Sequence, residues 1–134
     1  MTIKWTEEKV LNAISEARNA GYNAAQAKLG ELVAAGPAFA VTNGDGSIAG
    51  TMLDVCGMAN LKIKARGKFY LLAKKLSVGN RHSCGRHYYG GGRLNIFDST
   101  MRQELSVNKA ACKAQSEYLF TQYGIESHVE SRID

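Results

Sequence analysis

The chain has few of the residues that cross-link or anchor a protein. Its 134 residues include one proline and three cysteines. Cys56, Cys84 and Cys112 are an odd number at wide spacing, which is not a disulfide framework and is typical of a reducing compartment. No apolar run reaches the roughly 18 to 20 residues that cross a bilayer, and the N-terminus lacks the apolar stretch of a signal peptide. We therefore expect a cytoplasmic protein with no membrane association. The length predicts a single domain over residues 1–134.

Acidic residues are missing from the middle of the chain. No carboxylate lies between Asp54 and Asp98, although the formal net charge of the whole chain is only +5. The basic residues of this stretch are Lys62, Lys64, Arg66, Lys68, Lys74, Lys75, Arg81, Arg86 and Arg93. A region of one charge attracts anions. The alternative interpretation is a basic face that stays in solvent for solubility.

Residues 79–93 are the part of this region with the clearest chemistry. They hold three arginines, two histidines, two tyrosines and five glycines. Arginine forks suit phosphate, amide groups of adjacent glycines can surround one oxygen, and a tyrosine ring can stack on a base. Adjacent tyrosines on a strand face opposite ways, so we expect one of the two to reach a ligand and the other to pack. The predicted ligand-binding residues of this region are Arg81, Arg86, His87, Tyr88, Tyr89, Gly91 and Arg93, with Lys64 and Arg66 from the preceding strand.

Catalytic and metal chemistry receive weaker support from the same residues. His82, Cys84 and His87 could bind a metal with Cys56 or Cys112 as a fourth ligand, but the second close pair typical of structural zinc is missing. A nucleophilic Cys84 beside a histidine is a second alternative. The acids lie away from the basic centre, which disfavours carboxylate catalysis. Neither a GxxxxGK[ST] loop nor a GxGxxG turn is present. We predict no catalytic residue, no resident metal and no cofactor.

The hydrophobic spacing predicts an α+β domain. We expect a long N-terminal helix and a C-terminal helix packed on a small antiparallel or mixed sheet. The N-terminal helix, about 6–35, begins at the Thr6 cap and ends at Gly36, either unbroken or bent near Gly21. Ser106 is expected to cap the C-terminal helix, which Gly124 ends. The remaining predicted elements are strands 39–42 and 47–55 around a turn, strand 58–66, a short helix over 69–76, a brief strand over 94–97 and a closing strand over 125–133.

Two of these elements carry further expectations. In strand 58–66, Lys62, Lys64 and Arg66 alternate with apolar residues, so the three cations would share one face. In the C-terminal helix, the predicted inward face is Val107, Ala110, Ala111, Ala114 and Tyr118. The many alanines of the first helix would let a second helix come close, so this helix could serve self-association in a homo-oligomer, whereas packing on its own sheet is the simpler interpretation.

Segments 54–59 and 123–134, together with the helix over 108–114 and the opening helix around 21–25, resemble small proteins of tailed bacteriophages. The group that the chain resembles is the phage anti-Thoeris sponge proteins. This resemblance implies a protein of the host cytoplasm that assembles into oligomers with ligand held between protomers. Such proteins sequester cyclic ADP-ribose-type signals, or in some members cyclic oligonucleotides, without catalysis. The resemblance also implies Lys28 as a phosphate contact, although the family favours arginine there.

Residue chemistry and resemblance lead to one hypothesis with two alternatives. We predict a non-enzymatic binder of a phosphate-bearing nucleotide, with a basic pocket built from residues 62–68 and 81–93. The first alternative is a nucleic-acid-binding module that uses the basic face over residues 62–93. The second is a protein-interaction inhibitor that places this face against an acidic partner. The sequence does not identify the ligand.

Overall fold

The computed structural model describes residues 3–65, 67–76, 84–86, 92–94, 96 and 102–133, with backbone alone at 41, 49, 51 and 84–86. The fold is α+β, as predicted. Along the chain the elements are α1 (Glu7–Ala35), β1 (Phe39–Thr42), β2 (Ile48–Met52), β3 (Gly57–Ile63), α2 (Lys68–Leu76), β4 (Cys84–Arg86), β5 (Gly92–Leu94), α3 (Leu105–Tyr123) and β6 (His128–Ile133).

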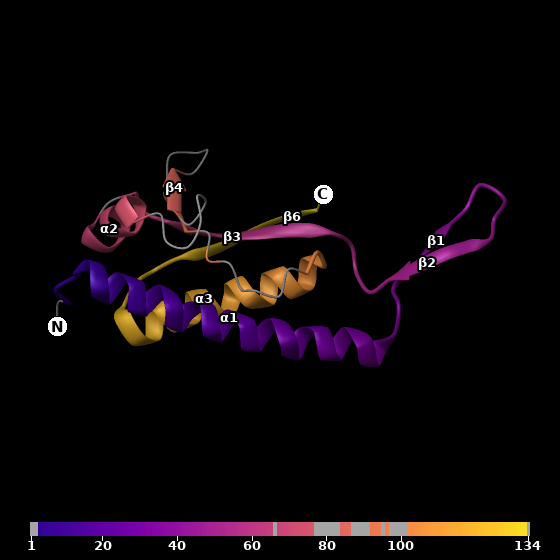
Figure 1. Cartoon of the computed structure of the whole chain (residues 1–134), viewed down its shortest axis with the longest axis horizontal. Helices are drawn as coiled ribbons and strands as arrows, with labels where there is room; N and C mark the ends of the chain where they lie inside the picture. The colour runs from indigo at the N-terminus through magenta and orange to yellow at the C-terminus, as the bar shows by residue number, and fades with distance from the viewer. Residues whose placement is uncertain are drawn as a thin grey trace.

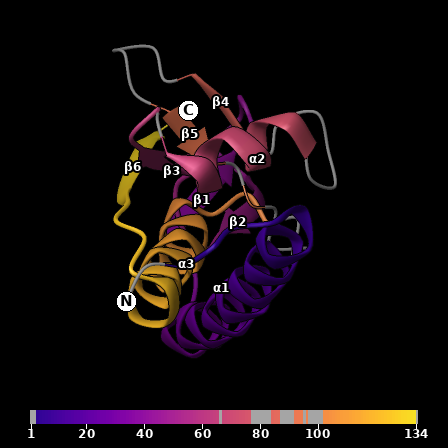
Figure 2. The ribbon, with the colours of Figure 1, turned by 90° about the vertical axis from the view of Figure 1, so that its left-hand side faces the viewer.

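The main sheet has four antiparallel strands in the order β4-β5-β3-β6. Helices α1 and α3 lie together against one face of this sheet (Figure 2), and α2 lies at the end of β3, where it packs beside the start of α1 (Figure 1). Buried and exposed side chains alternate along β3 because one face of the sheet is covered by helices: Leu61 and Ile63 are buried towards the helices, while Met58 is exposed. The core joins these strand residues to Val10 and Ile14 of α1.

Helix α1 runs unbroken through Gly21, so the alternative of a bend into two helices is wrong. Gly21 is buried where α1 crosses α3, and a Cβ added there would lie 2.5 Å from Nε2 of Gln115. Gln115 is only 1% exposed, and its Nε2 donates a hydrogen bond to the Ile96 carbonyl at 3.1 Å. The glycine is therefore a close-packing residue rather than a helix breaker.

The start of α3 differs from the prediction that Ser106 caps it. The N-cap position is Glu104, and its side chain makes no capping bond. Instead, the Ser106 amide and hydroxyl both donate to Oδ2 of Asp54, at 2.8 and 2.6 Å. The Asp54 carboxylate is therefore the negative group at the N-terminus of α3, where the helix dipole stabilises negative charge. The hydrogen bonds from Ser106 hold the pKa of Asp54 below its usual value.

The buried face of α3 is also shifted from the prediction. Val107 and Ala111 are buried as expected, but Ala110, Ala114 and Tyr118 are only half-buried. The other buried positions are Cys112, Gln115 and Leu119. The reason is that α3 lies between two neighbours, α1 on one side and strands β3 and β6 on the other, so its covered arc is set by both.

The bounds of several strands depart from the prediction, and β2 ends at Met52 rather than at residue 55. Strand β3 ends at Ile63, so Lys64 lies beyond it, and Arg66 of the predicted strand 58–66 lies outside the described residues. Strand β5 spans Gly92–Leu94, and residues 95 and 97 of the predicted strand 94–97 lie outside the described residues. Strand β6 begins at His128 rather than at residue 125. The additional strand β4 was not predicted.

The β1–β2 hairpin extends away from the rest of the molecule beyond the end of α1 (Figure 1). Its two strands pair only with each other, and its large apolar side chains Phe39 and Ile48 are exposed. At the tip, Asp45 accepts hydrogen bonds from the Ser47 amide and hydroxyl. Local turn chemistry therefore shapes the hairpin. Within the described residues, no helix is long and apolar enough to cross a membrane.

Candidate functional site

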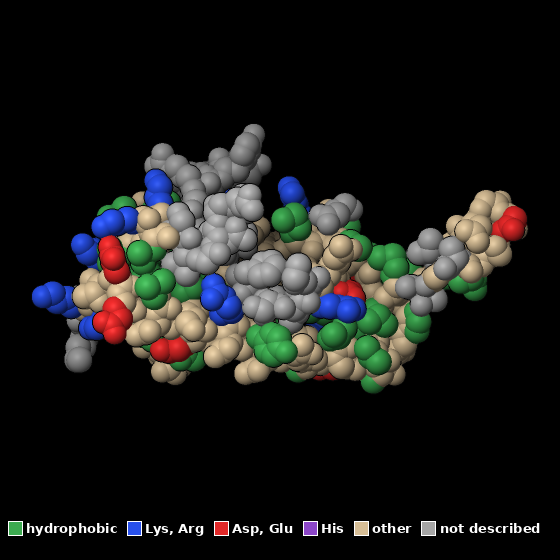
Figure 3. Space-filling model, in the orientation of Figure 1, with side chains coloured by type: hydrophobic (Ala, Val, Ile, Leu, Met, Phe, Trp, Pro, Cys, Tyr) green, Lys and Arg blue, Asp and Glu red, His purple; other side chains and the backbone are tan. Residues whose placement is uncertain are grey.

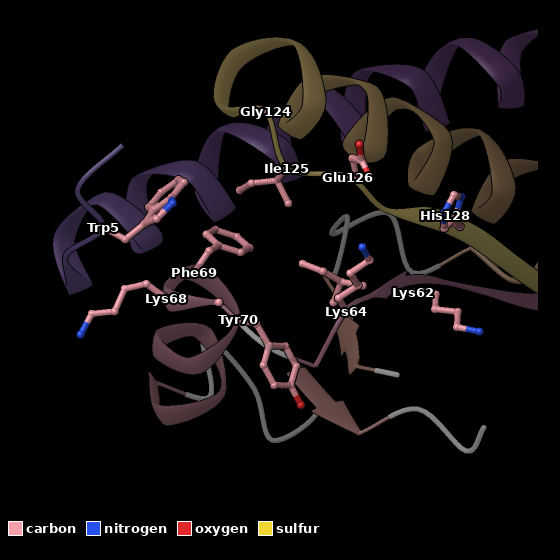
Figure 4. Close-up of a pocket in the computed structure, with 12 residues that line it drawn as sticks. Trp5, Lys62, Lys64, Lys68, Phe69, Tyr70, Gly124, Ile125, Glu126 and His128 are labelled. Carbon is pink, nitrogen blue, oxygen red and sulfur yellow. The ribbon is translucent and has the colours of Figure 1, made fainter. Parts of the chain in front are cut away.

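A hollow of about 600 Å³ lies at the end of the main sheet where α2 faces the segment that connects α3 to β6. Among the described residues, Trp5 before the N-cap of α1, the end of β3, the start of α2 and residues of the 124–128 segment line it (Figure 4). Small-molecule sites in proteins fall in this range of volumes. The lining residues divide into an aromatic wall and a charged rim.

The aromatic wall is built from Trp5 and Phe69. Their ring centroids are 4.8 Å apart at an interplanar angle of 61°, an edge-to-face contact. The ring centroid of Tyr123 lies 5.5 Å from that of Trp5. Ile125 completes the wall (Figure 4). Phe69 is buried whereas Trp5 is half-buried, so the indole is the ring that remains accessible.

A hydrogen-bonded group holds Tyr123 in place. The hydroxyls of Tyr118 and Tyr123 both donate to Oε1 of Glu16, at 2.6 and 2.8 Å. These bonds lower the pKa of the Glu16 carboxyl. Burial, followed by the bond to Glu16, raises the pKa of Tyr123 to about 12. The phenol therefore stays neutral and keeps its ring against Trp5.

The charged rim is mainly cationic. Its lysines are Lys62, Lys64 and Lys68, and its one carboxylate is Glu126, with His128 beside it. Figure 4 shows Lys62, Lys64, Glu126 and His128 on the side of the hollow opposite Trp5, whereas Lys68 extends outwards. Figure 3 shows further lysine and arginine side chains gathered at the end of the molecule that the start of α1 and α2 form. The hollow therefore combines a flat apolar surface with net positive charge.

The structure places only some of the predicted site residues. Lys64 lines the hollow, and Arg93 lies on β5 directly opposite Lys62 of β3. Arg86 lies on β4, where its backbone pairs with that of Gly92. The other predicted residues lie outside the described part of the chain: Arg66, Arg81, His87, Tyr88, Tyr89 and Gly91.

Lys28 is not brought to this hollow. It lies on α1 beside a second hollow of about 370 Å³ that Lys109 and Lys113 of α3 also line. Its Nζ is 3.3 Å from a carboxylate oxygen of Glu31, one helical turn away. Lys28 and Lys64 therefore belong to different surfaces of this chain.

Several lining residues were not predicted from sequence. Phe69 was expected only as a core residue of its short helix, and Trp5, Glu126 and His128 were not considered. Trp5 is the only tryptophan, and it precedes the Thr6 cap. A large aromatic ring just outside a helix start is the one signal that could have indicated it. Glu126 and His128 carry no comparable signal.

The described residues contain no group of three histidine, cysteine or acidic side chains that could hold a metal ion. The proposed ligands His82 and His87 lie outside these residues, and Cys84 is described by its backbone alone. Cys112 is buried and Cys56 half-buried.

No protein-family model matches the chain, and neither does any curated protein or solved structure. The resemblance to phage anti-Thoeris sponge proteins therefore stays a prediction. The candidate site is defined by its own chemistry, an aromatic wall at Trp5 and Phe69 facing Lys62 and Lys64.

Proposed function

We propose that this protein binds a phosphate-bearing nucleotide reversibly in the hollow between α2 and β6 and sequesters it without catalysis. The observation that carries the proposal is the pairing of the Trp5–Phe69 wall with Lys62 and Lys64 across one cavity. A nucleotide has the same two parts, a flat base and an anionic phosphate. The cavity volume of about 600 Å³ suits such a ligand.

The aromatic wall and the charged rim of the hollow contribute separately to the free energy of binding. Stacking of a base on an aromatic side chain contributes on the order of 1–3 kcal/mol. Lysine ammonium groups attract phosphate as point charges, more strongly where the aromatic wall keeps water away. The half-buried Trp5 ring, backed by Tyr123 at 5.5 Å, is held in position before a ligand arrives. Preorganisation of this kind reduces the entropy lost on binding.

The resemblance to anti-Thoeris sponge proteins directs the choice of ligands. It makes cyclic ADP-ribose isomers and cyclic oligonucleotides the first compounds to test, and it supports a role in which the protein removes an immune signal during phage infection. A homo-oligomer belongs to the same proposal. The basic lining of the hollow is consistent with any of these anionic ligands.

The only tryptophan of the chain lies in the hollow, so intrinsic fluorescence reports binding directly. Titration with cyclic ADP-ribose isomers, cyclic dinucleotides and AMP should change Trp5 emission in a saturable way. Lys64→Gln should reduce the affinity for the ligand by about tenfold, the effect of one charge-assisted contact. The matched control is Lys113→Gln, which removes a lysine from the other hollow and should leave affinity unchanged.

Two further measurements separate the alternatives. Ligand released by heating the loaded protein should be intact; a cleaved or modified product would contradict sequestration. Affinity that increases with oligonucleotide length and falls steeply with salt would instead identify a nucleic-acid-binding surface. No saturable change in Trp5 emission with any nucleotide would refute a base-stacking site.

A further inference from the structure

We propose that Lys62 and Arg93 form a subsite for a second phosphate next to the hollow, so that the ligand is a nucleotide with two neighbouring phosphates. This inference rests on the proposed function and extends it beyond the lining of the hollow. Lys62 belongs to that lining, whereas Arg93 lies one strand further across the sheet.

The register of the sheet puts the two cations together. Lys62 of β3 pairs directly with Arg93 of β5 on one side and with His128 of β6 on the other. Directly paired residues of antiparallel strands project from the same face of the sheet. The neighbouring row, Leu61 with Leu94 and Val129, faces the helices. Arg93, Lys62 and His128 therefore form one row on the opposite face, with adjacent strands about 4.8 Å apart.

This row carries an electrostatic cost that the fold offsets, among the described residues, only at Lys62. Like charges directly opposite each other on adjacent strands destabilise a sheet. The carboxylate of Glu130 is 3.9 Å from the Lys62 ammonium, the only ion pair that the described residues show for this lysine. On the other side of Arg93, the paired residue is Gly85, which has no side chain to contribute a counter-charge. An anion over the row would relieve this repulsion.

Arg93 also has an unused donor. Its Nε is buried and has no hydrogen-bond partner in the described structure. A buried donor without a partner destabilises the fold, so such groups call for an explanation such as a bound ion or ligand. A guanidinium is the side chain best suited to hold a phosphate through two parallel bonds. A phosphate oxygen is an acceptor of the kind that Arg93 lacks.

The position of Lys62 connects this row to the hollow. A base stacked at Trp5 would place its first phosphate near Lys64 and Lys62, and a second phosphate would then lie over Lys62 and Arg93. A nucleoside monophosphate has only one phosphate to place in this arrangement. The structure therefore assigns selectivity for diphosphate-type ligands to Arg93.

The test is calorimetry of the full chain with AMP, ADP and inorganic pyrophosphate. Wild-type protein should bind ADP at least about tenfold more tightly than AMP, the contribution of one charge-assisted pair. Arg93→Gln should reduce ADP affinity to that of AMP and leave AMP unchanged, and Arg93→Lys should give an intermediate loss if Gln impairs folding. Arg132→Gln is the matched control, because Arg132 pairs with Met58 on the same face but away from the row.

The outcomes distinguish this inference from the proposed function. Equal affinity for AMP and ADP, unaffected by Arg93→Gln, would overturn the subsite while a Trp5 response to both preserves the nucleotide site. Binding of pyrophosphate that Arg93→Gln abolishes, without any nucleotide effect on Trp5 emission, would support the subsite and refute the base-stacking site. Loss of AMP and ADP binding to the same extent in Arg93→Gln would overturn the subsite, because Arg93 would then act on the whole ligand.

Discussion

Replacement of Gly21 by alanine tests the packing of α1 on α3, which places both Trp5 and the wall of the hollow. Helix propensity alone favours the change, because alanine is about 1 kcal/mol better than glycine inside a helix. The structure reverses the sign. An alanine Cβ would lie 2.5 Å from Nε2 and 2.9 Å from Cγ of Gln115, a side chain that is 1% exposed.

The expected magnitude follows from two costs. Overpacking a core costs about 1–3 kcal/mol. Displacement of Gln115 breaks its bond to the Ile96 carbonyl and leaves buried polar groups unpaired, at about 1–3 kcal/mol. At their midpoints, the costs exceed the propensity gain by about 3 kcal/mol. For a chain of this size, that lowers the unfolding midpoint by roughly 10 °C.

The assay is thermal unfolding followed by far-ultraviolet circular dichroism, with Gly30→Ala as the matched control. Gly30 lies in the same helix with nothing within 4 Å of an added Cβ, so alanine there should raise the midpoint by about 3–4 °C. A Gly21→Ala protein as stable as Gly30→Ala would refute the close contact with Gln115. Gly21→Ala combined with Gln115→Ala should recover part of the loss, because the two positions are in contact.

The remaining predictions concern pH and the hairpin. The neutral Tyr123 phenol is stabilised in the fold, so its contribution to stability is complete below about pH 10 and is lost as pH rises through about 12. In an absorbance titration of the phenolates, Tyr123→Phe should remove the component that titrates near 12. An unchanged high-pH component would contradict the contact with Glu16. Replacement of residues 38–53 by a glycine-serine linker should leave the unfolding midpoint within about 3 °C, because an exposed two-stranded hairpin adds little stability. A midpoint lower by about 10 °C would show that the rest of the fold depends on it.

The elements that sequence predicted well are those with local stop signals. Gly36 ends α1 at a φ of 87°, and Gly124 ends α3 in the left-handed region at a φ of 70°. Both positions favour glycine for a reason contained within a few residues of chain. The prediction that Ser106 caps α3 was wrong because any serine near a helix start looks like a cap in the sequence. The actual partner of its hydroxyl, Asp54, is 52 residues away.

The residues of the candidate site also fall into those that the sequence indicated and those that it did not. Lys62 and Lys64 were recognisable from the absence of acids around them and from their alternation with apolar residues. Phe69 was recognisable only as an apolar residue of a short helix, because burial against Trp5 depends on where the chain before α1 lies. The contribution of residues 124–128 could not be predicted, since it requires the return of β6 alongside β3.

The sequence alone was sufficient to predict the class of fold, the long first helix, the glycines that end the helices and the basic centre of the chain. Tertiary structure alone decided that β3 pairs with β5 and β6, and so that Arg93, Lys62 and His128 share a row. Strand pairing depends on backbone hydrogen bonds, which carry no residue identity, and on the helices that cover one face. Positive charge is a property of composition, whereas a site needs the register that brings particular charges together.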